Sequence, residues 1–208
     1  MKANTQERIL VTTLLLFNEQ GEPNTTTNEI ADAVDISPGN LYYHFRKKSD
    51  LVEALLLEFQ ADARRILQPA ASPGSLDDFW VFLHRLLELT AGYRFLLRDM
   101  ESLVATYPKV GTALKHFARA LAASFELKLQ ALIESGVVKL GENDARLVAR
   151  NLAVIALFSE KFDALADSAP SSEDTAMRVA ASVLNVLQPF VGEAYSRQFS
   201  ELAAYYSV

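Results

Sequence analysis

Apolar residues recur every three or four positions along most of the chain, a spacing that predicts an all-α protein. The first apolar stripe, widened by neighbouring leucines, predicts a helix over residues 5–20. We expect a short helix after residue 26, a second short helix within residues 36–48, and a longer helix from residue 49 to about residue 67. No strand alternation, glycine-rich phosphate loop or internal repeat interrupts the pattern.

The rest of the chain also reads as helices joined by short polar links. The expected helices cover residues 76–90, 93–106, 109–135, 142–167, 172–188 and 190–206. Pro69, Pro73 and Gly74 predict a linker, and Pro170 predicts a loop over residues 168–172.

Three parts of the chain follow from these breaks. We expect an N-terminal domain over residues 1–50, a connecting helix over residues 51–70 and a helical C-terminal domain over residues 75–208.

The stretch over residues 36–48 shows the most specific local pattern. Ser37 is a preferred N-cap residue, and Pro38 suits the first helical position because its missing N–H would have no partner there. Leu41 and Phe45 lie four residues apart, so they share one helix face and can pack on a core. This packing would leave Tyr43 on the outward face.

The preceding segment carries a second helix-start signal. Thr26 and Glu29 have capping-box spacing, with the Thr26 side chain and the Glu29 carboxylate satisfying each other's backbone N–H groups. We expect the helix that begins there to bury Ile30, Ala31 and Val34. Asp35 and Ile36 then make the turn into the next helix. Two short helices joined by a tight turn are the ingredients of a helix-turn-helix.

Composition excludes several kinds of chemistry. The 208 residues include no cysteine, which excludes disulfides, thiolate zinc sites and cysteine nucleophiles. The N-terminal residues are polar and lack the apolar region of a signal peptide. The longest clean apolar run, residues 152–158, is far shorter than the roughly 20 residues of a membrane span. We therefore expect a cytoplasmic protein with no membrane partner.

The charge balance is informative only locally. The net charge is −6, which argues mildly against a general nucleic-acid binder. Between Asp35 and Asp50, however, there is no acidic residue, and the ionisable groups are His44, Arg46, Lys47 and Lys48. A small positive area on an acidic protein can bind DNA, and the acidic remainder would suppress non-specific binding.

Residues 5–60 resemble the DNA-binding domain of the TetR (tetracycline repressor) family of bacterial transcriptional regulators. The resemblance rests on four blocks at matching spacing: Ile9…Phe17…Gly21, Thr26-Thr27-Asn28-Glu29-Ile30-Ala31, Ser37-Pro38-Gly39-Asn40-Leu41-Tyr42-Tyr43-His44-Phe45 and Lys48…Leu51. It implies that the third helix enters the major groove of an operator half-site, and that the protein is a repressor rather than an activator.

The resemblance also implies which residues face DNA. The candidates are Thr27, Ser37, Pro38, Gly39, Asn40, Tyr42, Tyr43, His44, Lys47 and Lys48. Among them, Thr27 and Lys48 would hold phosphates. Lys47 departs from the family pattern, which usually has a small N-capping residue here, and would add a cation near phosphate.

Each of these residues also has a purely structural interpretation. The two tyrosines could be half-buried packing aromatics, since Tyr is intermediate in burial. His44 could be a structural hydrogen bonder, and the cations over residues 46–48 could form a solvated turn. DNA binding is favoured because every residue type falls where a helix-turn-helix needs it.

The C-terminal region resembles the effector-binding and dimerisation domain of the same family. Aromatic or polar residues on otherwise apolar helices are candidates for a small-molecule pocket: Trp80, His84, Phe95, Arg98, Met100, Tyr107, His116, Phe117 and Asn151. The aromatic members could equally be plain core. A charge that faces a core needs a partner, which for Arg98 and His116 could be an anionic acyl or other lipophilic ligand, or Asp99, Glu101 or another acid.

Small residues on the helices over 142–167 and 172–188 suggest close packing in a four-helix dimer interface, or equally within one chain. They are Ala145, Ala149, Ala153, Ala156, Ala180, Ala181 and Ser182. A two-fold homodimer would double the contacts that one short helix can make with a palindromic operator.

Enzymatic activity is not expected. His84 and His116 lack metal-ligand spacing, and no serine lies in a Gly-x-Ser-x-Gly elbow, so we expect neither a metal nor a cofactor. Three hypotheses remain: a ligand-responsive DNA-binding regulator, a DNA-binding regulator controlled by a protein partner or by no effector, and a helical enzyme or carrier that binds no DNA.

Overall fold

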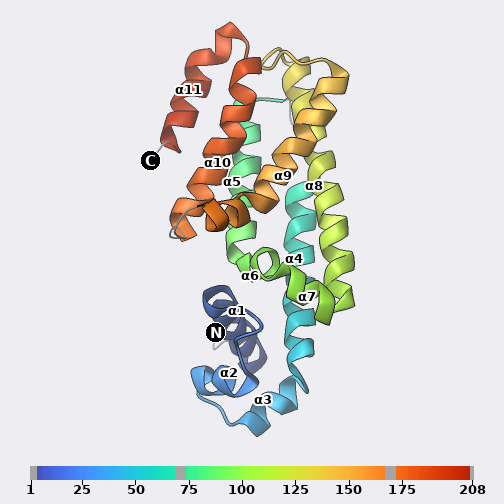
Figure 1. The fold of residues 1–208 in the computed structure, drawn as a ribbon, viewed down its shortest axis with the longest axis vertical. Coiled ribbons are helices and arrows are strands. Elements are labelled where there is room, and N and C mark those ends of the chain that lie inside the picture. Colours follow the sequence, from blue (N-terminus) through green and yellow to red (C-terminus); the bar gives the residue numbers. More distant parts are fainter. Residues whose placement is uncertain (1–3, 69–73, 167–171, 207–208) are drawn as a thin grey trace. The chain divides into compact units, whose positions relative to one another are not determined.

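The computed structural model describes residues 4–68, 74–166 and 172–206, which are helical almost throughout (Figure 1). Over these residues the only pairing of extended backbone is an isolated antiparallel bridge between Val138 and Val191. The predicted linker prolines Pro69 and Pro73, and Pro170 in the predicted loop, lie outside the described residues.

The chain divides into two compact units. The N-terminal unit takes residues 1–62 and 92–115, and the C-terminal unit takes residues 63–91 and 116–208. The N-terminal unit therefore contains a segment from the middle of the sequence in addition to the first helices. Its elements are α1 (Thr5–Gln20), α2 (Thr27–Val34), α3 (Pro38–His44), most of α4 (Lys48–Leu67), α6 (Arg94–Arg98), α7 (Met100–Thr106) and the first turns of α8 (Pro108–Glu134).

The helix starts predicted in the N-terminal unit are confirmed. Thr26 accepts from the Glu29 N–H while the Glu29 carboxylate accepts from the Thr26 N–H, which completes the capping box of α2. Ser37 caps α3 by accepting from the Asn40 N–H at 3.2 Å, and Pro38 occupies the first turn. Local sequence thus specifies where both short helices begin.

One face of each short helix lies in the core of the N-terminal unit. Phe17 on α1, Ile30 on α2 and Leu41 on α3 are fully buried, and Phe45 directly after α3 is nearly so. Helix α2 contacts both α1 and α3. Burial of one such side chain contributes about 1.5–3 kcal/mol, so Leu41 and Phe45 stabilise the packing of α3, which has only two turns.

The segment over residues 93–106 is divided where a single helix was predicted. Helix α6 ends and α7 begins around Asp99, whose backbone has φ −96° and ψ 19°. The Asp99 carboxylate accepts from the backbone N–H of Glu22 and from the Arg98 side chain. These contacts with the turn after α1 hold Asp99 in the non-helical conformation. The spacing of apolar residues within residues 93–106 does not depend on these contacts, so it could not indicate the break.

The C-terminal unit is a set of packed helices with an aromatic centre. Its elements are the end of α4 from residue 63, α5 (Leu76–Gly92, except its last residue), the remainder of α8, α9 (Glu142–Ala166), α10 (Ser172–Leu187), the 3₁₀ turns Gln188–Phe190 and Glu193–Tyr195, and α11 (Ser196–Tyr205). Phe79 and Phe82 pack against Phe125, with ring centroids 6.4 Å and 5.3 Å apart. Helix α9 packs against α10.

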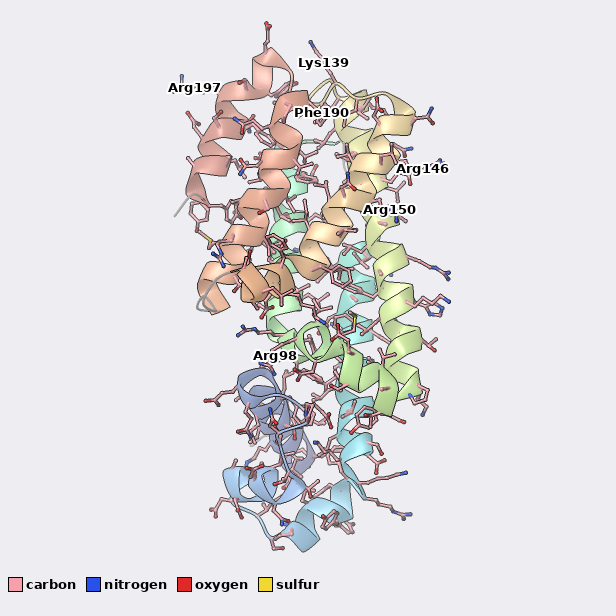
Figure 2. All side chains as sticks on the ribbon, viewed as in Figure 1. Arg98, Lys139, Arg146, Arg150, Phe190 and Arg197 are labelled. Carbon is pink, nitrogen blue, oxygen red and sulfur yellow. The ribbon has the colours of Figure 1, made fainter. Side chains whose placement is uncertain are left out.

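The prediction of one continuous helix over residues 190–206 is wrong. The chain leaves the helix after Phe190 and returns to an α-helix only at Ser196. Between these points, Lys139 N–H donates to the Phe190 carbonyl at 2.8 Å and Gly192 N–H donates to the Val137 carbonyl at 2.9 Å. Pairing with the α8–α9 link therefore replaces the helical hydrogen bonds of this segment, and Figure 2 labels Lys139 and Phe190 at this position.

Gly21, which ends α1, allows a test of the packing between the turn after α1 and Asp99. Its φ of 97° and ψ of 148° lie in a region that only glycine adopts easily, and a Cβ there would lie 3.2 Å from Asp99 Oδ2. We expect Gly21→Ala to lower the free energy of unfolding by about 1–3 kcal/mol in urea denaturation.

Gly92→Ala is the matched control, because the added methyl group would meet no atom within 4 Å beyond its chain neighbours and the backbone of its own helix. It should leave stability unchanged or raise it slightly. Equal losses in the two variants would show that the backbone at Gly21 does not need glycine.

Candidate nucleic-acid interface

The outward face of α3 is the most exposed aromatic surface of the N-terminal unit. The Tyr43 side chain is 83% exposed and the Tyr42 side chain 44% exposed, while Leu41 on the same helix is buried. Pro38, Gly39 and Asn40 in the first turn are also exposed. A buried leucine and phenylalanine on one side thus present amide, backbone and tyrosine groups to solvent on the other.

Side chains on this face support one another. The Tyr42 hydroxyl lies 3.1 Å from Thr27 Oγ1 at the start of α2, within hydrogen-bond distance. The Tyr43 ring meets the half-buried His44 ring edge-to-face, with centroids 5.2 Å apart. Thr27 and α3, which are separated in the sequence, therefore belong to one surface. Neither tyrosine is a core residue, which removes the packing interpretation for Tyr43.

The start of α4 provides the cations, but they differ in environment. Arg46 and Lys47 are exposed and form no ion pair with any described residue. Lys48 Nζ instead lies 2.9 Å from Glu22 Oε1, and its side chain is only 25% exposed. Of the two predicted phosphate-binding lysines, only Lys47 projects freely into solvent.

The missing small N-cap residue before α4 is partly replaced. The Asp50 carboxylate accepts from the Lys47 N–H at 3.2 Å, which is the returning half of a capping box. Asp50 thereby satisfies one backbone donor at a position where Lys47 cannot cap the helix itself.

The capping box of α2 makes this surface sensitive to acid. Hydrogen bonds from the Thr26 backbone and hydroxyl lower the pKa of Glu29 below its ordinary value of 4.5. A carboxyl group with a lowered pKa in the folded state contributes stability above pH 4.5, and this contribution disappears as the pH falls through the lowered pKa. The start of α2 is therefore fully capped at neutral pH.

The predicted pocket residues are divided between the two units. Phe95, Arg98, Met100 and Tyr107 belong to the N-terminal unit, and the other five belong to the C-terminal unit. Phe95 is core and packs against Phe17, with ring centroids 5.2 Å apart. Met100 is half-buried.

Arg98 has protein partners for its charge. Its guanidinium donates to the carbonyls of Asn18 and Phe17, each at 2.8 Å, and to Asp99 Oδ1 at 3.0 Å. These carbonyls end α1, where a cation interacts favourably with the helix dipole. Figure 2 labels Arg98 beside α1. Of the partners considered from the sequence, the structure supports Asp99.

In the C-terminal unit, three of the predicted pocket residues are exposed: His84, His116 and Asn151. Trp80 is half-buried and stacks on His84, with centroids 5.3 Å apart and an interplanar angle of 11°. Phe117 is buried. A contact of these residues with a ligand stays a prediction. Phe117 and Trp80 are the least exposed of the five, so they are the ones best suited to line an internal pocket.

Sequence reasoning missed Glu22 and Asn18. Asn18 Nδ2 donates to the Gly92 carbonyl at 2.7 Å, and its Oδ1 accepts from the Phe95 N–H at 3.1 Å. Glu22 is buried and contacts Lys48 and Tyr107. Their partners lie 26 to 85 residues away in the sequence, so no local spacing signals them.

The described residues contain no group of three or more His, Cys, Asp or Glu side chains arranged to hold a metal ion. Likewise, no helix among them is long and apolar enough to cross a bilayer.

A helix-turn-helix with an exposed, cation-flanked second helix defines a DNA-binding protein. Comparison with known families agrees: residues 9–55 match the bacterial regulatory proteins of the tetR family, and residues 58–199 match the TetR bacterial transcriptional repressors. The chain belongs to the TetR family and is a transcriptional regulator.

Individual relatives support the family assignment, one over about a third of the chain and others over nearly its whole length. The probable HTH-type transcriptional regulator YttP of Bacillus subtilis is 35% identical over 72 residues, about a third of either chain. A TetR-family transcriptional regulator from Marinobacter aquaeolei VT8 is 28% identical, with a TM-score of 0.87 over 98% of this chain and 99% of that one. CprB of Streptomyces coelicolor, solved with its biological operator sequence, shares the fold at 21% identity, a TM-score of 0.69, and coverage of 97% and 95%.

Proposed function

We propose that the protein binds a palindromic DNA operator as a homodimer and represses transcription until a small molecule releases it. The observation that carries the proposal is the outward face of α3, which Leu41 and Phe45 hold in place and on which Tyr43 is 83% exposed. Exposed amide and aromatic groups on a short helix can contact base edges, and nearby cations can contact phosphates.

The homodimer is supported by an exposed apolar stripe on α9. Its members recur at helical spacing on one face: Leu147 (61% exposed), Val154 (49%), Phe158 (40%), Phe162 (69%) and Leu165 (89%). A contiguous apolar face of this kind on a soluble protein marks a surface that another molecule covers. A second copy of α9 across a two-fold axis would cover it with the same residues.

The small residues predicted for this interface have another role. Ala145, Ala149, Ala153, Ala156 and Ala180 are buried within the single chain, where α9 packs on α10. This burial favours packing within one chain for these alanines, whereas Ala181 and Ser182 of the same predicted set are half-buried. The proposed dimer therefore rests on the large apolar side chains of α9.

The effector proposal rests on family membership and on the apolar C-terminal unit. The argument for a negatively charged ligand came from Arg98 and His116, but Arg98 is bound by Asp99 and α1, and His116 is exposed. We therefore propose a lipophilic effector, which would contact Phe117 and Trp80, and treat its acyl or anionic character as a matter for experiment.

DNA recognition can be tested with fragments that the protein itself selects. We expect sequencing of genomic fragments bound by purified protein to reveal an inverted repeat, with half-sites about one helical turn apart. On that operator, Tyr43→Ala should lose most of the preference for operator over random DNA. Lys47→Ala should weaken binding to both DNAs and lower the salt slope of log affinity by about 1.

Identical behaviour of these two variants would contradict the division between base contacts on α3 and phosphate contacts at the start of α4. If the wild-type protein enriched no sequence, the proposed operator binding itself would fail.

The dimer can be tested by placing charge on the α9 stripe. We expect the Phe158→Glu, Phe162→Glu double variant to elute as a folded monomer at micromolar concentration, because it would bury like charges opposite each other. Size-exclusion chromatography with light scattering reports the mass. Leu57→Glu on α4 is the control, since Leu57 is 64% exposed outside the stripe, and it should stay dimeric. A wild-type monomer would reject the homodimer.

The effector can be tested by native mass spectrometry with a long-chain acyl-CoA and a fatty alcohol of equal chain length. We expect at least one of them to form a one-to-one complex per protomer, and Phe117→Ala to weaken it. Retention of neither compound, together with no ligand carried through purification, would instead favour control by a protein partner.

A further inference from the structure

Glu22 is a buried carboxylate in the turn between α1 and α2. Its side chain is 7% exposed, and burial of an ionised carboxylate requires partners that compensate its lost hydration. Two elements of the N-terminal unit supply partners for the carboxylate, and a third binds the backbone of Glu22. Lys48 at the start of α4 lies 2.9 Å from Glu22 Oε1, and Tyr107 before α8 donates to the same oxygen at 2.7 Å. Asp99, between α6 and α7, accepts from the Glu22 N–H at 3.0 Å.

The Lys48 ammonium is directed into this network. Besides the carboxylate, it donates to the backbone carbonyl of Glu22, and it lies 5.8 Å from the centroid of the Phe17 ring. An ammonium group has three donors, and here two have oxygen acceptors on one residue while an aromatic face lies nearby. Lys48 thus has protein partners where a phosphate-binding lysine would have solvent.

Tyr107 keeps its donor role at all physiological pH values. Burial, followed by the hydrogen bond to Glu22, raises the pKa of the Tyr107 hydroxyl well above its ordinary value. The hydroxyl therefore stays protonated and donates to the carboxylate.

The Lys48 ammonium could bind either the Glu22 carboxylate or a DNA phosphate. If the ammonium moved to a DNA phosphate, it would gain a contact at the protein surface, but Glu22 would keep a buried negative charge with only Tyr107 as a partner for Oε1. Removal of one partner from a buried ion pair is strongly destabilising, whereas an exposed ion pair contributes little. The bond to Glu22 is therefore the one that persists.

We propose that Lys48 is a positioning residue for DNA recognition, held by Glu22 and Tyr107, and that the phosphate contact at the start of α4 comes from Lys47 and Arg46. The inference rests on the proposed operator binding. Lys48 directly follows the turn after α3, so its bond to Glu22 fixes the start of α4 relative to α1 and α2. Tyr107 and Asp99 extend the same network to α6, α7 and α8, so a displacement of Tyr107 would reach the DNA-reading helices through Glu22.

The test measures operator affinity as a function of salt for Lys48→Met, Glu22→Gln and Tyr107→Phe, at a temperature where circular dichroism shows each variant folded. We expect each to weaken operator binding by on the order of tenfold, while the salt slope stays at the wild-type value. The Lys48→Met, Glu22→Gln double variant should be no weaker than the worse single variant, because the two residues act through one bond.

Lys109→Met is the matched control. Lys109 is also paired with a glutamate, Glu53, but its side chain is 73% exposed and the pair lies on the surface. Its loss should change operator affinity less than twofold, as expected for a surface pair. This control separates the removal of a lysine charge from the removal of a buried anchor.

Two results would overturn the inference. If Lys48→Met lowered the salt slope by about 1 and Glu22→Gln left affinity unchanged or raised it, Lys48 would be a phosphate contact and the inference would be wrong. Tyr107→Phe retains the ring, so it decides the matter if the charge variants do not fold; wild-type affinity in this variant would also overturn the inference. Operator binding would stand in either case, because its own test uses Tyr43 and Lys47.

Discussion

The buried bond between Glu22 and Lys48 is the constraint on which the arrangement of the N-terminal unit depends. A carboxylate at 7% exposure is tolerated only while its cation and the Tyr107 hydroxyl remain in place. Helix α3 has only two turns and cannot hold its own orientation, so it relies on Leu41 for packing and on the fixed start of α4 at its other end. In the proposed operator complex, groups that do not touch DNA would thus determine the geometry of the surface that faces it.

This arrangement also changes what counts as the DNA-binding part of the chain. Residues 92–115 group with the N-terminal helices, and they contribute Asp99 and Tyr107 to the network around Glu22. Arg98 completes the connection by binding the carbonyls that end α1. A segment that sequence reasoning assigned to effector binding therefore serves, in the described structure, to brace the helix-turn-helix.

Local features were predictable and long-range ones were not. The cap at Ser37 and the burial of Leu41 depend on neighbours within four residues, so spacing alone identified them. The bend at Asp99 and the bonds of Arg98 to the carbonyls of α1 depend on residues more than 70 positions away, which no periodicity encodes. For the same reason, the sequence showed that Lys48 is a cation near α3 but could not show that Glu22 already binds it.

Hydrogen–deuterium exchange on the wild-type protein, with and without its operator duplex, tests the central claim most directly. If α3 and the start of α4 form the DNA-reading surface, saturating operator should slow backbone exchange over residues 37–48 more than anywhere else in the N-terminal unit. Exchange over those residues that stays unchanged while another surface becomes protected would contradict the account.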